Sequence, residues 1–217
     1  MMAHNRRSPW SLHEYAHRAI ADFTGPGDLI IDPMCGAGYT LVAAIEADRL
    51  AIGVEHQKYW AEMAQRRIEA ATGSSMSRGY AVAVHGDPFK VSQLVGPDVK
   101  GRVALVIASP QNGTARSVND PETVCGDLDD LATGFTVVFR QCRELLRPGG
   151  HLVVITVPVR HDGRRFDLDE MAHESALGAG FAAVTTTSTA EAPFSVYKIC
   201  DSVPASGKAG ACEDPRA

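Results

Sequence analysis

The sequence predicts an α/β fold with a doubly wound, mostly parallel sheet that is covered by helices on both faces. Short and nearly uninterrupted apolar runs recur along the chain, as is typical of strands buried on both faces. They cover residues 29–31, 51–54, 80–84, 103–108 and 151–157. Segments with helical spacing separate these runs. Because such an alternation implies right-handed crossovers, we expect parallel strands with a ligand crevice at their carboxyl ends.

The helices are predicted in the same order along the chain. One at about residues 9–23 precedes the first strand, and three more are expected at residues 40–48, 58–71 and 128–146. The run Arg147-Pro148-Gly149-Gly150 ends the last of these as a helix stop. A further helix at residues 168–177 comes before the last strands, near residues 181–187 and 194–200, which form a C-terminal antiparallel hairpin.

Composition narrows the class of protein. A chain of 217 residues with 45% apolar and 22% charged residues is long enough for one globular domain, which we expect at residues 1–201. Residues 202–217 are small, polar and rich in Pro and Gly, so we expect a disordered tail. A net charge of −5 gives no sign of the cationic face of a nucleic-acid-binding protein, although a local patch is left open.

Membrane, disulfide and metal sites are not expected. No apolar run approaches the roughly 18 residues that cross a bilayer, so a cytoplasmic location is expected. The five cysteines contain no C-x-x-C pair. Among the histidines, His85, His161 and His173 share no ligand spacing, and no metal is assigned.

The segment at residues 29–40 is the most informative, because it consists of a strand, a turn with two glycines and a helix start. Gly36 and Gly38 let a ligand lie against the backbone. No Gly-Lys-Ser/Thr follows, and Leu41 stands where a dinucleotide site has its third glycine. Asp32 at the strand tip would repel a pyrophosphate but attract an ammonium group. S-adenosylmethionine (SAM) carries both an ammonium and a sulfonium group.

Two further strand tips carry acids. Glu55 ends the second strand, nineteen residues after Gly36, where it could accept hydrogen bonds from both ribose hydroxyls. Asp87-Pro88-Phe89 follows the third strand and offers an acceptor for the adenine amine beside a ring to stack on. Three acids at neighbouring strand tips favour binding of SAM. Two alternatives are left open: the acids cap helices, or the protein is an unrelated nucleotide binder.

These residues resemble the class I SAM-dependent methyltransferases, in particular the group that methylates the amino groups of DNA bases (N4 of cytosine, N6 of adenine). Asp32-Pro33-Met34-Cys35-Gly36-Ala37-Gly38-Tyr39-Thr40 is similar to that group's D-P-F-x-G-S-G-T-T motif, and Ile52-Gly53-Val54-Glu55 with Tyr59 and Ala64 is similar to its I-G-x-E…Y…A helix. The resemblance covers residues 23–157 and implies a Rossmann-like sheet that binds SAM. The cofactor-binding residues that it implies are Asp32, Pro33, Cys35, Gly36, Gly38, Thr40, Glu55, His56, Asp87, Pro88 and Phe89. Cys35 itself is interpreted as a small packing residue and not a nucleophile.

The same group has a catalytic D-P-P-Y, N-P-P-Y or S-P-P-Y motif after the fourth strand. Here that place reads Ser109-Pro110-Gln111-Asn112. Ser109 and the Pro110 carbonyl could accept the hydrogens of an exocyclic amine and so localise its lone pair. The second proline and the aromatic residue that stacks on an extruded base are missing. An ordinary turn is the alternative interpretation, and Asp87-Pro88-Phe89 competes for the acceptor role.

Candidate substrate contacts are Gln111 and Asn112 beside this motif, together with Arg160 and Arg164 in a basic run after the fifth strand. That run could hold phosphates or be a solvated loop. The loop at residues 111–127 is too short for a target-recognition domain, so sequence-specific DNA readout would need a partner protein. The sequence therefore predicts a SAM-dependent N-methyltransferase acting on a DNA or RNA base. The alternatives are a catalytically impaired cofactor-binding relative and a small-molecule methyltransferase.

Overall fold

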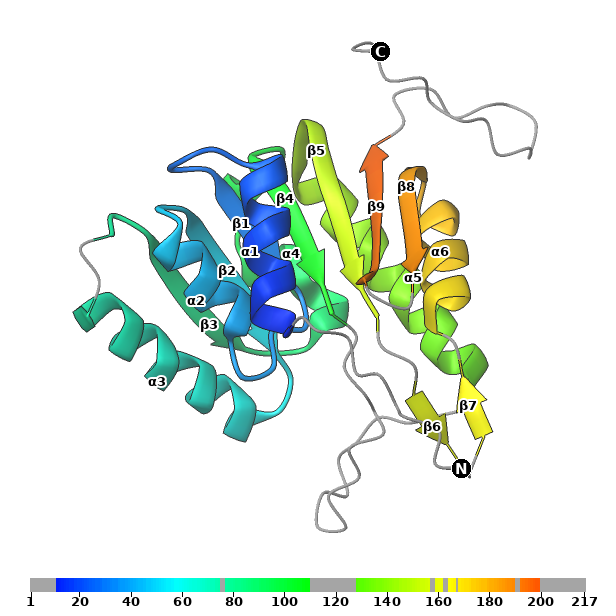
Figure 1. Cartoon of the computed structure of the whole chain (residues 1–217), viewed down its shortest axis with the longest axis horizontal. Coiled ribbons are helices and arrows are strands. Elements are labelled where there is room, and N and C mark those ends of the chain that lie inside the picture. The colour runs from blue at the N-terminus through cyan, green and yellow to red at the C-terminus, as the bar shows by residue number, and fades with distance from the viewer. Residues whose placement is uncertain are drawn as a thin grey trace.

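The computed structural model describes residues 11–74, 77–109, 128–156, 159–161, 164–166, 168–189 and 192–199. Its main sheet has seven strands in the order β3-β2-β1-β4-β5-β9-β8 (Figure 1). These are β1 (Leu29–Asp32), β2 (Leu50–Glu55), β3 (Tyr80–His85), β4 (Val103–Ala108), β5 (Leu146–Ile155), β8 (Phe181–Thr189) and β9 (Ala192–Ile199). The first five pair in parallel, whereas β9 pairs antiparallel with both β5 and β8. The predicted mixed sheet is confirmed.

Helices cover both faces of the sheet. They are α1 (Leu12–Phe23), α2 (Tyr39–Glu46), α3 (Lys58–Ser74), α4 (Val91–Leu94), α5 (Leu128–Leu145) and α6 (Leu168–Gly178), with short 3₁₀ turns η1 (Pro88–Lys90) and η2 (Pro97–Val99). One apolar core joins α1, α2 and α3 to the sheet face of Ile30 and Leu105. A second core joins α4, α5 and α6 to the face of Ile31 and Val106. Alternate strand residues thus enter opposite cores, as expected for strands buried on both sides.

The strand order reverses between β1 and β4. From β1 the chain moves outward through β2 to β3 and then returns to the other side of β1 with β4. In open α/β sheets ligands bind at the carboxyl ends of the strands beside such a reversal. The segments that follow β1, β2 and β3, and Ser109 after β4, therefore border the expected crevice.

Several predicted boundaries shift for local reasons. The Ser11 side chain accepts a hydrogen bond from the Glu14 N–H and the Glu14 carboxylate accepts one from the Ser11 N–H, so α1 begins at Leu12 and not at residue 9. Helix α5 ends at Leu145, one residue before the predicted end, and the residues predicted to stop it lie in β5. Strand β5 begins at Leu146, and its pairing with β4 shifts register between Leu146 and His151. Gly149, within this stretch, adopts a positive φ of 76°.

The basic run after the fifth strand is not a simple loop, as one alternative had it. Strands β6 (Val159–His161) and β7 (Arg164–Phe166) pair antiparallel and form a separate two-stranded ribbon. The expected tail at residues 202–217 lies outside the described residues. Within the described part of the chain, no helix combines the length and apolar character needed to cross a membrane.

Candidate functional site

Strand register brings the predicted residues to one edge of the sheet. Asp32 pairs with Gly53, and Glu55, two residues further along β2, pairs with His85. Ile31 pairs with Val106, so Asp32 is level with the next residue of β4, residue 107. Ser109 follows two residues later and therefore lies two positions beyond Asp32, as Glu55 does. Side chains two residues apart on a strand point to the same face. Asp32, Glu55 and Ser109 therefore belong to the same face and the same edge, on three neighbouring strands.

Asp32 is buried inside the turn that it introduces. Its side chain is 1% exposed, its Oδ1 accepts a hydrogen bond from the Met34 N–H at 3.0 Å, and the Thr40 hydroxyl donates to it. Burial raises the pKa of Asp32 to about 7, and the negative charge of Glu55 adds to the shift, while the bonds from Thr40 and Met34 oppose it. The carboxyl group thus fixes the turn and is poised to change its charge near neutral pH.

Glu55 bridges β2 to the glycine turn. Its side chain is largely buried, and Oε2 accepts a hydrogen bond from the Gly36 N–H at 3.0 Å. Oε1 accepts one from the Gln57 N–H at 2.8 Å and lies 3.1 Å from His56 Nδ1. Since each carboxylate oxygen has two lone pairs, acceptor positions remain for ribose hydroxyls. His56 is half-exposed, and its carbonyl lies 3.0 Å from His85 Nε2.

The two glycines of the turn are required for different reasons. Both have a positive φ, 51° at Gly36 and 83° at Gly38. A Cβ at Gly38 would come within 2.9 Å of the Ala64 Cβ and 3.0 Å of its Cα, so helix α3 leaves no room there. A Cβ at Gly36 would meet nothing within 4 Å. Gly38 therefore serves packing, whereas Gly36 borders open space that a ligand could fill.

Cys35 and Pro33, two further residues of the turn, are buried. A Cβ at Gly53 would lie 2.7 Å from Cys35 Sγ, so the thiol packs directly on β2. Burial raises the pKa of the Cys35 thiol far above its usual range, and the charges of Asp32 and Glu55 act in the same direction. This agrees with a packing residue and not a nucleophile.

Arg67 on α3 is a part of the site that the sequence analysis missed. Its Nη1 donates a hydrogen bond to the Ala37 carbonyl at 3.1 Å, and its guanidinium lies 4.2 Å from the centre of the Tyr39 ring. Ala64 and Arg67 are three residues apart and so lie on one helix face. Because Ala64 contacts Gly38, that spacing was the available signal.

The third strand tip fits the alternative of helix capping. Asp87 Oδ1 accepts a hydrogen bond from the Phe89 N–H at 2.9 Å and caps η1, which begins with Pro88. The Phe89 ring is 43% exposed and lies against α5, where a Cβ at Gly134 would come within 3.3 Å of it. Gln141 on α5 also donates a hydrogen bond to the Phe89 carbonyl. A contact of Asp87 or Phe89 with adenine stays a prediction.

The fourth strand tip is described only in part. Ser109 is 5% exposed and directly follows β4. Pro110, Gln111 and Asn112 lie outside the described residues. Arg160 on β6 pairs with Arg165 on β7, and Arg164 pairs with His161; nothing is described of the side chains of this ribbon. The substrate roles of Gln111, Asn112, Arg160 and Arg164 therefore stay predictions.

Known structures and sequences agree with this architecture. A solved TehB-like SAM-dependent methyltransferase from Corynebacterium glutamicum superposes with a TM-score of 0.55 over 86% of this chain and 88% of its own, at 14% identity. TrmN from Thermus thermophilus gives a TM-score of 0.58 over 89% of this chain and 49% of its own, at 17% identity. The chain has the class I methyltransferase fold. Both the fold and the resemblance predicted from sequence are confirmed.

The family model that matches this chain covers the glycine turn and strands β1 and β2. Residues 13–66 match the DNA methylase family model N6_N4_Mtase. YubD of Escherichia coli (strain K12), a protein named as a methylase, is 37% identical over 62 residues, which are 29% of this chain. The match spans 27% of the length of YubD. The segment that matches the family model contains Asp32, Gly36, Gly38 and Glu55.

Proposed function

We propose that this protein is a SAM-dependent N-methyltransferase that acts on an exocyclic amino group of a DNA or RNA base. The proposal rests on one observation. The stretch that matches the DNA methylase family, residues 13–66, is the stretch in which Asp32, the glycine turn and Glu55 meet at the sheet edge. The likeness to the solved structures, which covers most of the chain, is one of fold only. The acceptor side of the reaction therefore rests on the chemistry of the residues after β4.

The residues at the edge fit SAM. Open space at Gly36 leaves room for a ligand against the backbone. Asp32, once ionised, would pair with the amino-acid ammonium, and the remaining acceptor positions of Glu55 would bind the ribose hydroxyls. When bound, SAM supplies a methyl group on a sulfonium, which is ready for transfer to a nucleophile. The protein has to bind it, hold the acceptor nitrogen in line with it, and exclude water.

Ser109 is the residue that we assign to the acceptor amine. It is buried and lies on the same face and at the same register level as Glu55. Its hydroxyl oxygen would accept a hydrogen from the amine and so withdraw the nitrogen lone pair from the base. The Pro110 carbonyl would accept the second hydrogen. A Ser109→Ala variant should lose turnover with little change in the dissociation constant for SAM.

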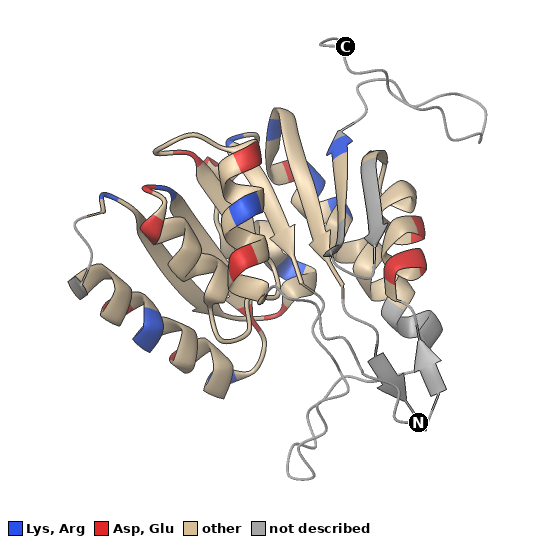
Figure 2. Ribbon diagram, viewed as in Figure 1, with Lys and Arg blue, Asp and Glu red and all other residues tan. Residues whose placement is uncertain are grey.

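Two observations bear on nucleic acid as the substrate. Tyr59 and Trp60 open helix α3 just after Glu55, are 63% and 41% exposed, and contact each other edge to face at 5.1 Å. Such exposed rings suit base stacking. The described Lys and Arg residues, by contrast, are spread over separate elements in the ribbon of Figure 2. Because specific readout needs base contacts, we propose that a partner protein supplies the target recognition.

A small-molecule methyltransferase is the second candidate. The net charge of −5 favours it, because the phosphate backbone of a nucleic acid would meet no excess of positive charge.

A cofactor-binding relative without activity is the third candidate, because Gln111 and Asn112 replace the Pro-Tyr pair of the family motif. Restoring that pair (Gln111→Pro with Asn112→Tyr) should leave SAM binding unchanged. A gain of DNA methylation in this variant would support an impaired wild type.

Two measurements test the proposal. Calorimetry with SAM and its demethylated product should give micromolar binding to the full chain. Glu55→Ala should weaken it at least tenfold, because both ribose acceptors are lost, while the control Glu62→Gln on the exposed face of α3 should not change it. Absence of binding in the wild type would overturn the proposal. Transfer of a labelled methyl group to DNA, RNA or cell-extract small molecules then identifies the acceptor class.

A further inference from the structure

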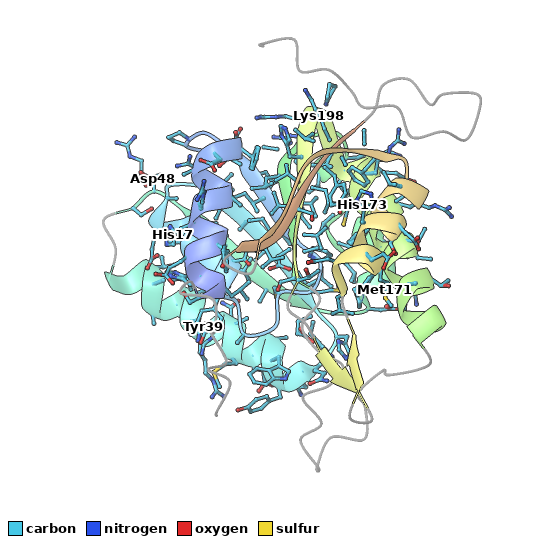
Figure 3. All side chains as sticks on the ribbon, turned by 45° about the vertical axis from the view of Figure 1, so that its right-hand side comes forward. His17, Tyr39, Asp48, Met171, His173 and Lys198 are labelled. Carbon is cyan, nitrogen blue, oxygen red and sulfur yellow. The ribbon has the colours of Figure 1, made fainter. Side chains whose placement is uncertain are left out.

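A cluster of two histidines and one glutamate lies on the helix pair α1–α2. His13 and His17 are four residues apart on α1, in the sequence His13-Glu14-Tyr15-Ala16-His17, and Glu46 is the last residue of α2. Residues at i and i+4 share a helix face. Figure 3 labels His17 on α1 and Tyr39 at the start of α2. This pair was not predicted from the sequence, where His85, His161 and His173 were the histidines compared for ligand spacing.

The ligand atoms of this cluster converge on one point. Glu46 Oε2 lies 3.2 Å from His13 Nε2 and 2.7 Å from His17 Nε2. The two imidazole rings are 4.5 Å apart. One ligand atom from each of the three side chains lies within 4.8 Å of the others. Two imidazole nitrogens and a carboxylate oxygen are a donor set that Zn²⁺ and similar divalent metals prefer.

Packing of α1 on α2 holds the three side chains together. Both helices contribute fully buried alanines to the same core, Ala16 from α1 and Ala43 from α2. Small residues let the helix axes approach closely. The side chains of His13, His17 and Glu46 remain 32%, 37% and 43% exposed, so ions can reach them from solvent. The site is therefore built on rigid elements and yet open.

We propose that His13 Nε2, His17 Nε2 and Glu46 Oε2 form a binding site for a divalent transition metal, with Zn²⁺ as the fitting ion. Tetrahedral ligands about 2.0–2.1 Å from zinc stand roughly 3.3 Å from one another. The His13–Glu46 distance already matches, and the His17–Glu46 distance needs a small rotation of half-exposed side chains. A water would take the fourth position. The site adjoins a hollow of about 640 Å³, whose wall includes His13, Tyr39 and Glu46.

The surroundings favour a metal that links two helices over a hydrolytic centre. The spacing His-Glu-x-x-His also occurs in metalloproteases, where the glutamate is the general base. Here Glu14 Oε2 instead accepts hydrogen bonds from the Ser11 N–H and hydroxyl and closes the capping box of α1. A bound ion would join α1 to the end of α2. It would thereby stabilise the packing of α1 on α2, and α2 begins directly after the glycine turn.

Titration of metal-stripped, tag-free full-length protein with Zn²⁺ tests this site and does not depend on methyltransferase activity. We expect micromolar or tighter binding and a rise in the thermal midpoint of roughly 5 °C at a hundredfold excess over the dissociation constant. His17→Ala and Glu46→Gln should each weaken binding at least tenfold. Arg18→Ala, the adjacent exposed residue on α1, is the matched control and should bind like the wild type.

Substitution of Co²⁺ for Zn²⁺ separates this site from the cysteines. Visible d–d absorption without a thiolate charge-transfer band is expected from histidine and carboxylate ligands. A thiolate band, or equal affinity in the wild type and both cluster variants, would overturn the assignment. So would the absence of binding at high micromolar Zn²⁺, since the cluster would then be only a hydrogen-bonded group of two imidazoles around a carboxylate.

Discussion

Two polar clusters of this protein differ mainly in burial. At the sheet edge, Asp32 and Glu55 are 1% and 7% exposed and interact with backbone N–H groups of the glycine turn and its neighbours. On the helix pair, His13, His17 and Glu46 are about one-third to two-fifths exposed and interact with one another. Each cluster joins side chains from two elements of secondary structure. Only the first is largely buried.

The difference teaches what burial does to a group of ionisable side chains. Inside the fold, a charge that loses its hydration must be compensated or neutralised, so the pKa of Asp32 rises to about 7. At the surface, water screens the same kinds of charges, and a side chain can exchange a hydrogen bond for a ligand at small cost. The buried cluster should therefore control stability and its pH dependence, and the half-exposed cluster should respond chiefly to added ions.

The largest change in the free energy of unfolding is expected for Asp32→Asn. Because the pKa is near 7 in the folded state and near 3.9 in the unfolded state, the folded protein holds the proton between these values. The stabilising contribution of this carboxyl group is complete below about pH 4 and is lost as the pH rises to about 7. The Asn side chain of the variant carries no charge at any of these pH values, so the variant does not lose stability in this way. The variant should exceed the wild type in free energy of unfolding by up to about 4 kcal/mol at pH 8.

Urea unfolding at several pH values checks this prediction. The difference between Asp32→Asn and the wild type should vanish near pH 4 and grow towards pH 7. Asp98→Asn, at an exposed acid in η2, is the control and should give no such slope. An Asp32→Asn variant that is less stable than the wild type at pH 8 would contradict the idea that burial dominates the energetics of this carboxyl group.

A pair of glycine variants separates packing from ligand space. Gly38→Ala should destabilise the fold by about 3 kcal/mol, because a positive φ disfavours alanine and the new Cβ meets the Ala64 backbone. Gly36→Ala should cost only about 1 kcal/mol, from its φ alone. The second variant should nevertheless weaken SAM binding, since its Cβ enters the open space. Thermal unfolding and calorimetry measure both effects, and equal destabilisation would refute the distinction.

The affinity for SAM should itself depend on pH. If the ammonium of SAM pairs with Asp32, binding requires the carboxylate, so the affinity should fall by up to tenfold for each pH unit below about 7. Above that pH it should level off. Binding below pH 7 should release a proton, which calorimetry in buffers of different ionisation enthalpy detects. No proton release, with a pH-independent affinity, would show that Asp32 acts only inside the turn.

The two clusters also differ in how well the sequence predicts them. Asp32 and Glu55 each end an apolar run, and parallel pairing brings strand ends to one edge, so their proximity was predictable. The capping of η1 by Asp87 was open from sequence, because one carboxylate can cap or bind a ligand. The short ribbon β6–β7 carries no period-two apolar pattern. Glu46 meets His13 and His17 only through helix packing, which sequence spacing does not encode.

The smallest expected effect is that of Glu46→Gln in a metal chelator. Half-exposed polar contacts between side chains contribute little to folding, so the free energy of unfolding should change by less than about 1 kcal/mol. With Zn²⁺ present, the wild type should gain stability and the variant should not, because the gain follows the differential affinity for the ion. Urea unfolding with and without Zn²⁺ gives both comparisons. If Glu46→Gln lost more than about 2 kcal/mol of unfolding free energy in chelator, the cluster would stabilise the fold even without metal. Exposure to water would then not explain why the two clusters differ.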